Sequence, residues 1–144
     1  MIPKITRIFI SAVVMVAVAS FAADQKTIKK VVAPHTSAAN GQQMYESYCA
    51  SCHGKTGKGD GPAASALKTP PTDLTTLAKN NKGQFPSLHV FHAINGEEGI
   101  PSHGSKDMPV WGPPLRAISG GSTAEVQMRI NNLTSYVESL QAKD

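Results

Sequence analysis

The chain is poor in several residue types, and each scarcity excludes a class of protein. Its 144 residues include two cysteines, Cys49 and Cys52, with two residues between them. A disulfide between them would close a tiny loop and hardly constrain the unfolded chain. Four Phe, three Tyr and one Trp supply little apolar mass for the core of a small domain. No basic run with interleaved aromatic residues indicates nucleic-acid binding, and the formal charge of +4, which falls to +2 without Lys4 and Arg7, is too mild to suggest it.

The N-terminal residues have the pattern of an export signal. Lys4 and Arg7 precede an apolar stretch at 8–19, and small residues around Ala22 suit a signal peptidase. The apolar stretch is short for a bilayer span, which needs about 20 residues. We therefore predict a cleaved signal peptide over residues 1–22 and an exported, periplasmic-type location. An uncleaved membrane anchor is the less favoured alternative.

The rest of the chain is long enough for one small domain. Residues 23–37 contain several lysines and a proline with little periodicity, which predicts a flexible leader. Residues 38–144 then form the predicted domain.

Cys49, Cys52 and His53 form the most informative motif of the chain. The spacing C-x-x-C-H is the attachment signature of c-type haem, because two thiols can bond the porphyrin and the adjacent imidazole can bind its iron. A dithiol redox pair would need a thioredoxin-like βαβ context, and no β-branched strand pattern flanks the motif. A zinc site could recruit the two thiols with His89 and His92, but the spacing is unusual for one. The predicted export signal agrees with this interpretation, because c-type haem is joined to protein outside the cytoplasm.

The periodicity elsewhere predicts an all-α protein with long loops. One helix is expected from about Ala38 to Cys49, and a last helix after the capping box of Ser122 and Glu125. Leu133 and Tyr136 of that helix could bracket the bare backbone of Gly41. Shorter helical segments are expected between these two helices. The expected shorter segments are 63–68, 72–78 and 87–94, with glycine-rich and proline-rich loops at 53–62 and 99–114.

Together these segments resemble the class I monohaem cytochromes c over about Asn40 to Leu140. The resemblance rests on the order of the first helix, the Cys49–His53 motif, the glycine-rich loop, the segment from Met108 to Gly112 and the last helix. It implies a cytochrome c fold of three to five helices with long loops around one covalently bound haem c. Within the family, the loops are similar to bacterial exported cytochromes and to the small cytochrome domains attached to terminal oxidases.

The resemblance also implies roles for single residues. His53 would be the proximal iron ligand and Met108 the distal one, with the Pro62 carbonyl as the candidate acceptor for the His53 ring. Trp111 could donate its indole N–H to a haem propionate, or it could simply pack in the core. Three histidines remain alternative sixth ligands, although solvent-exposed positions are expected for them: His89, His92 and His103.

Two protein ligands on the iron would leave no open position for oxygen or peroxide. The expected function is therefore that of a one-electron carrier rather than an enzyme. Its partners would be redox proteins: a quinol-oxidising complex, a dehydrogenase or a terminal oxidase. Membrane contact would occur only through partners unless the signal is retained, and no nucleic acid is expected. There are two alternatives. The first is a haem protein with a displaceable distal ligand that acts as a catalytic or gas-sensing unit. The second is an electron-entry subunit of a larger oxidoreductase.

Overall fold

A computed structural model describes residues 34–96 and 108–142 of the chain. The predicted signal peptide, most of the predicted leader and His103 lie outside these residues. None of the helices in the described ranges is long and apolar enough to cross a membrane.

The described residues form helices and contain no β-strand. This result confirms the predicted all-α class. In chain order the elements are α2 (Gly41–Tyr48), α3 (Ala50–His53), the 3₁₀ turns η1 (Ala64–Ala66) and η2 (Leu74–Thr76), α4 (Leu77–Asn80), α5 (Ser87–Asn95), α6 (Gly112–Ile118) and α7 (Thr123–Ser139).

The two longest predicted helices begin at side-chain caps. The Asn40 side chain accepts a hydrogen bond of 2.9 Å from the Gln43 amide at the start of α2. The Ser122 hydroxyl accepts one of 3.3 Å from the Glu125 amide at the start of α7. Each cap satisfies an amide that has no partner within its helix, so the local sequence determines where these helices begin.

Helix α6 was not expected, because its first three residues fall at the end of the predicted loop 99–114. Pro113 and Pro114 occupy its first turn. Proline is favourable there, since the first amides of a helix have no intrahelical partner and proline has no amide hydrogen. The Trp111 amide also donates to the Ile94 carbonyl at 3.1 Å, which joins the start of α6 to the end of α5.

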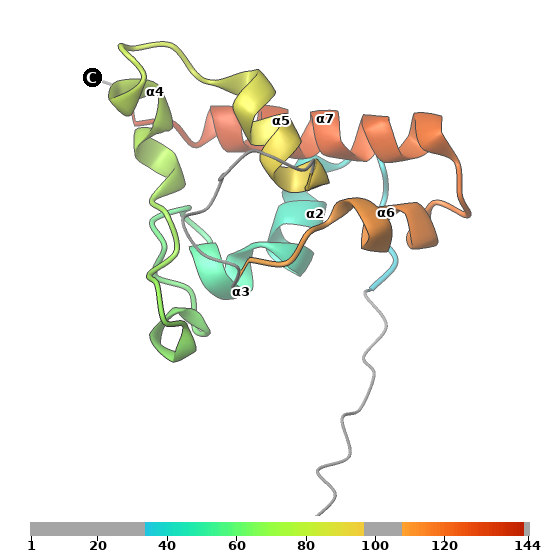
Figure 1. Ribbon diagram of the computed structural model, residues 1–144, viewed down its shortest axis with the longest axis horizontal. Coiled ribbons are helices and arrows are strands. Elements are labelled where there is room, and N and C mark those ends of the chain that lie inside the picture. The colour runs from blue at the N-terminus through green and yellow to red at the C-terminus, as the bar shows by residue number, and fades with distance from the viewer. Residues whose placement is uncertain (1–33, 97–107, 143–144) are drawn as a thin grey trace, which may run out of the picture. The chain divides into compact units, whose positions relative to one another are not determined.

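Helix α7 contacts α2, α5 and α6 and so organises the core (Figure 1). Its apolar stripe is buried as predicted at Val126, Ile130, Leu133 and Val137. The facing helices contribute buried side chains to the same cluster: Met44, Tyr45 and Tyr48 from α2, and Val90 and Ile94 from α5.

Gly41 is the point of closest approach between α2 and α7. A methyl group on Gly41 would overlap the backbone carbonyl of Asn132 and lie 3.1 Å from the Cβ of Tyr136. The expected contact with Tyr136 is therefore present, and the nearest atoms belong to the backbone of Asn132. The glycine lets the two backbones meet.

We expect Gly41→Ala to destabilise the protein by about 1–3 kcal/mol, because the added methyl has to push the two helices apart. An uncrowded glycine inside a helix would give the opposite sign, a gain of roughly 1 kcal/mol. Denaturant unfolding of the haem-loaded protein measures the difference. The exposed Gln42→Ala variant in the same helix is the control and should change stability by less than about 0.5 kcal/mol. A more stable Gly41→Ala protein would contradict this packing.

A buried arginine completes the core. Arg129 of α7 is only 1% exposed and forms an ion pair of 2.8 Å with Glu125. Its guanidinium also donates to the Thr36 carbonyl at 2.9 Å and to the Ser119 hydroxyl at 3.0 Å. These bonds satisfy a charge that would otherwise be costly to bury. They attach the start of the described chain and the turn before α7 to the same side chain.

Candidate functional site

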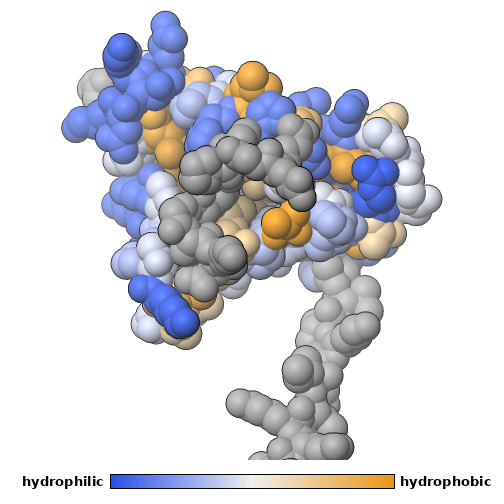
Figure 2. All heavy atoms as spheres, viewed as in Figure 1, coloured by the Kyte–Doolittle hydropathy of each residue, from blue (hydrophilic) through white to orange (hydrophobic). Residues whose placement is uncertain are grey.

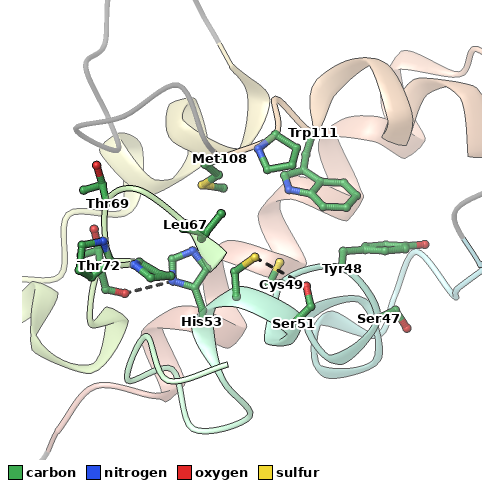
Figure 3. Close-up of a pocket in the computed structure, with 14 residues that line it drawn as sticks. Ser47, Tyr48, Cys49, Ser51, His53, Leu67, Thr69, Thr72, Met108 and Trp111 are labelled. Atoms are coloured by element: carbon green, nitrogen blue, oxygen red, sulfur yellow. Dashed lines mark hydrogen bonds between the residues drawn. The ribbon is translucent and has the colours of Figure 1, made fainter. Parts of the chain in front are cut away.

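The two cysteines and the histidine of the C-x-x-C-H motif line a cavity of about 270 Å³ (Figure 3). Its walls come from three parts of the chain: the end of α2 with α3, the loop 67–72, and the segment that leads into α6. A second hollow of about 60 Å³ has a mainly apolar lining, to which α5 and α7 contribute, and shares four residues with the cavity. The shared residues are Cys49, His53, Thr72 and Met108.

The backbone places both thiols and the imidazole on this cavity. Helix α2 ends where the Cys49 amide donates to the Tyr45 carbonyl at 2.8 Å. The single turn of α3 follows, with the His53 amide donating to the Cys49 carbonyl at 2.9 Å. A turn of helix returns the chain to the same side after three to four residues, so all three side chains of the motif line one wall.

Cys49 and Cys52 are free, partly buried thiols. Burial, and next the neighbouring Cys52, raise the pKa of the Cys49 thiol to about 12. A reactive redox dithiol depends instead on a lowered thiol pKa, because the thiolate is the nucleophile. Cys49 therefore does not have the electrostatics of the attacking thiol of a redox dithiol.

His53 is 6% exposed, and its Nδ1 lies 3.0 Å from the Thr72 carbonyl oxygen. Burial lowers the pKa of the imidazole below its ordinary value, and the bond to Thr72 partly opposes this effect. The imidazole is therefore neutral at pH 7. Since a carbonyl oxygen can only accept, Nδ1 carries the proton and Nε2 keeps its lone pair for a metal.

The predicted role of the Pro62 carbonyl is wrong, because Thr72 provides the acceptor for His53. The loop before and after Pro62 folds back onto α3 instead of onto the imidazole, and Pro62 lines a separate, open depression. The loop amides bond to carbonyls of the motif: Gly59 to His53 at 2.8 Å, Gly61 to Cys52 at 3.1 Å and Ala63 to Ser51 at 2.8 Å. The pair Pro70-Pro71, which favours extended backbone before Thr72, was the available sequence signal.

Met108 and Trp111 line the cavity across from the motif, and Figure 3 shows the Met108 thioether and the His53 imidazole both directed into it. The centroids of the Trp111 and Tyr48 rings are 5.2 Å apart. Trp111 therefore packs against Tyr48, as expected if its role is packing. The propionate bond of Trp111 stays a prediction. Among the alternative ligands, His89 lines the smaller hollow beside Met108, although the residue as a whole is exposed.

The zinc alternative finds no support in the described ranges. No three side chains among their His, Cys, Asp and Glu residues come together in a way that could hold a metal ion.

Residues 36–118 match the family model of cytochrome c oxidase, cbb3-type, subunit III. The chain belongs to this family. It is thus a cytochrome c domain with a haem-based role in electron transfer, which confirms the resemblance recognised in the sequence. Neither the curated proteins nor the solved structures compared with the chain include a match.

The side chains of this cytochrome c domain fit the haem c that the family implies. Two free thiols lie beside a neutral imidazole whose Nδ1 is already bonded and whose Nε2 is available. A thioether and an indole lie on the opposite wall, and the inner hollow is mainly apolar, as a porphyrin requires.

Proposed function

We propose that this cytochrome c domain is a one-electron carrier with His/Met ligation. Cys49 and Cys52 would hold the haem through thioether bonds, and His53 and Met108 would bind its iron. The observation that carries the proposal is that these four side chains line one cavity, although Met108 lies far from the other three in the sequence. When bound, the haem supplies the one-electron chemistry of its iron.

Each of these side chains has a distinct task. The Thr72 carbonyl orients His53 and makes its imidazole a stronger donor. Met108 occupies the distal wall, so that small molecules do not find an open position, and its soft sulfur favours the reduced state. Trp111 would donate its indole N–H to a propionate from the rim of the cavity.

The proposed setting is an exported electron-transfer chain that ends in an oxidase. The export signal predicted over residues 1–22 would bring the domain to the compartment where c-type haem is joined to protein. The family name supports a terminal oxidase as the partner, whether the domain is a free carrier or an electron-entry subunit.

The visible spectrum of the purified protein, with and without carbon monoxide, tests the proposal. A His/Met carrier should show far-red absorption from iron-bound sulfur when oxidised. Adding carbon monoxide to the reduced protein should leave its visible spectrum almost unchanged, because both axial positions are filled. Rapid carbon monoxide binding by the wild type would favour the alternative of a haem protein with a displaceable distal ligand.

Association with an acidic redox partner should slow as salt is added. Figure 2 shows hydrophilic side chains gathered over α4 and the turn after it, where Lys79 and Lys82 are exposed but do not line the cavity. Lys68 is also exposed and stands between Leu67 and Thr69, which line the cavity. Charges at the rim of the cavity attract an acidic surface over about 8 Å at physiological ionic strength.

Reversing the charge of single lysines tests which part of the surface attracts the acidic partner. Lys68→Glu should lower the association rate constant by roughly tenfold at low salt, and raising the salt should reduce the difference. Lys82→Glu is the control, because the residues next to Lys82 do not line the cavity. Stopped-flow electron transfer measures both rates. Equal effects of the two reversals would contradict docking at the rim.

A further inference from the structure

The backbone segment that carries the Thr72 carbonyl is held in place on two sides. On one side lies the glycine-rich loop, where the Leu74 amide donates to the Gly57 carbonyl at 2.7 Å. Gly59 packs so closely on the same segment that a side chain there would overlap the Pro71 carbonyl oxygen. These contacts come from the loop that directly follows the haem motif.

On the other side the segment is held by the chain just after α7. The Gln141 side-chain amide donates to the Leu74 carbonyl at 2.7 Å and to the Val137 carbonyl at 3.0 Å. Its side-chain oxygen accepts from the Ala78 amide at 2.8 Å. The Ala142 amide adds a bond of 2.9 Å to the Thr75 carbonyl. Gln141 therefore joins the end of α7 to both ends of the segment 74–78.

We propose that Gln141 is a positioning residue for the proximal iron ligand. It holds Leu74, two residues after Thr72, and thereby keeps the Thr72 carbonyl against the Nδ1 of His53. The inference deepens the proposed function and rests on its assignment of His53 as the ligand. A hydrogen bond from Nδ1 makes the imidazole a stronger donor and so favours oxidised iron. Gln141 thus lowers the reduction potential from outside the cavity.

The loss of Gln141 should raise the reduction potential if Gln141 is a positioning residue, and should lower it if Gln141 has a purely structural role. If its loss merely opened the cavity to water, the oxidised iron, which carries the greater charge, would be better solvated and the potential would fall. If its loss weakens the bond between His53 and Thr72, the imidazole donates less charge and the potential rises. The sign of the shift therefore separates the two roles.

The test compares Gln141→Leu with Gln127→Leu in the full-length haem-loaded protein. Leucine keeps much of the volume of Gln141 and removes its three hydrogen bonds, whereas Gln127 is exposed on α7, the helix that Gln141 follows. NMR of the reduced protein measures solvent exchange of the His53 Nδ1 proton, and electrochemical titration measures the potential. In Gln141→Leu we expect exchange roughly tenfold faster, as for the loss of one hydrogen bond. We also expect a higher potential than in the wild type or in Gln127→Leu.

A lower or unchanged potential in Gln141→Leu, or unchanged Nδ1 exchange, would overturn the positioning role. Failure of the proposed function is visible separately in the wild type. If the proposed function is wrong, the wild type itself will lack covalent haem, or its His53 resonances will not be shifted by the iron.

Discussion

Met108→Ala should abolish the far-red absorption of the oxidised protein and lower its reduction potential. The thioether enters the cavity from the wall opposite His53, and in the proposed coordination it is the sulfur bound to iron. Its loss removes a ligand that favours reduced iron, so the potential should fall by tens to hundreds of millivolts, within the roughly 0.8 V range that axial ligands span. Carbon monoxide and cyanide should bind faster, because the sixth position becomes vacant.

Two further variants make this result specific. Met108→His should remain six-coordinate yet have a lower potential, because imidazole favours oxidised iron more than a thioether does. Met128→Ala is the control, since Met128 is 44% exposed on α7 and does not line the cavity. If the far-red absorption survives in Met108→Ala, another side chain binds the iron. His89, which lines the inner hollow beside Met108, would then be the first residue to replace.

Replacing both Cys49 and Cys52 by serine should leave no haem that resists denaturation and acid extraction. Both thiols lie on the cavity and are free to bond, and they are the only cysteines of the chain. Serine cannot form the thioether bonds, so any haem left in the variant would be held only by its ligands and by apolar contacts. Extraction into acidified organic solvent, followed by absorption spectroscopy of the protein fraction, measures what remains.

The single variants are the internal controls of this experiment. Cys49→Ser and Cys52→Ser should each retain at most one thioether bond, which mass spectrometry detects as haem still attached to the corresponding peptide. Ser51→Ala changes a residue of the same motif without removing a thiol, and should keep full covalent attachment. Haem that stays with the double variant through extraction would refute covalent attachment at these residues.

The local patterns of the sequence succeeded where short-range chemistry decides the structure. The cap at Ser122 involves a residue only three positions further on, and the apolar stripe of α7 follows from helical periodicity alone. Both could therefore be predicted with no knowledge of the fold. Helix α6 was missed because two prolines and a glycine were taken as signs of a loop. The same prolines are favourable in a first turn.

The acceptor for His53 could not be predicted in this way. The glycine-rich loop suggested Pro62, the nearest proline after the motif. The amides on either side of it instead bond to carbonyls of the motif, and Thr72 supplies the acceptor. Which of several carbonyls meets an imidazole depends on how the whole loop folds back, and sequence spacing does not determine that path.

By itself the sequence determined the helical class, the attachment motif and the family, because each depends on residues close together in the chain or on their order. Only the tertiary structure decided which distant groups satisfy one another. Arg129 bonds to Thr36 across the fold, and Gln141 bonds to Leu74 and Ala78. An arginine or a glutamine in a sequence looks like an ordinary surface residue. Arg129 becomes part of the interior, and Gln141 becomes partly buried, only when folding brings carbonyls and hydroxyls to their donors, since a buried polar group is stable only with such partners.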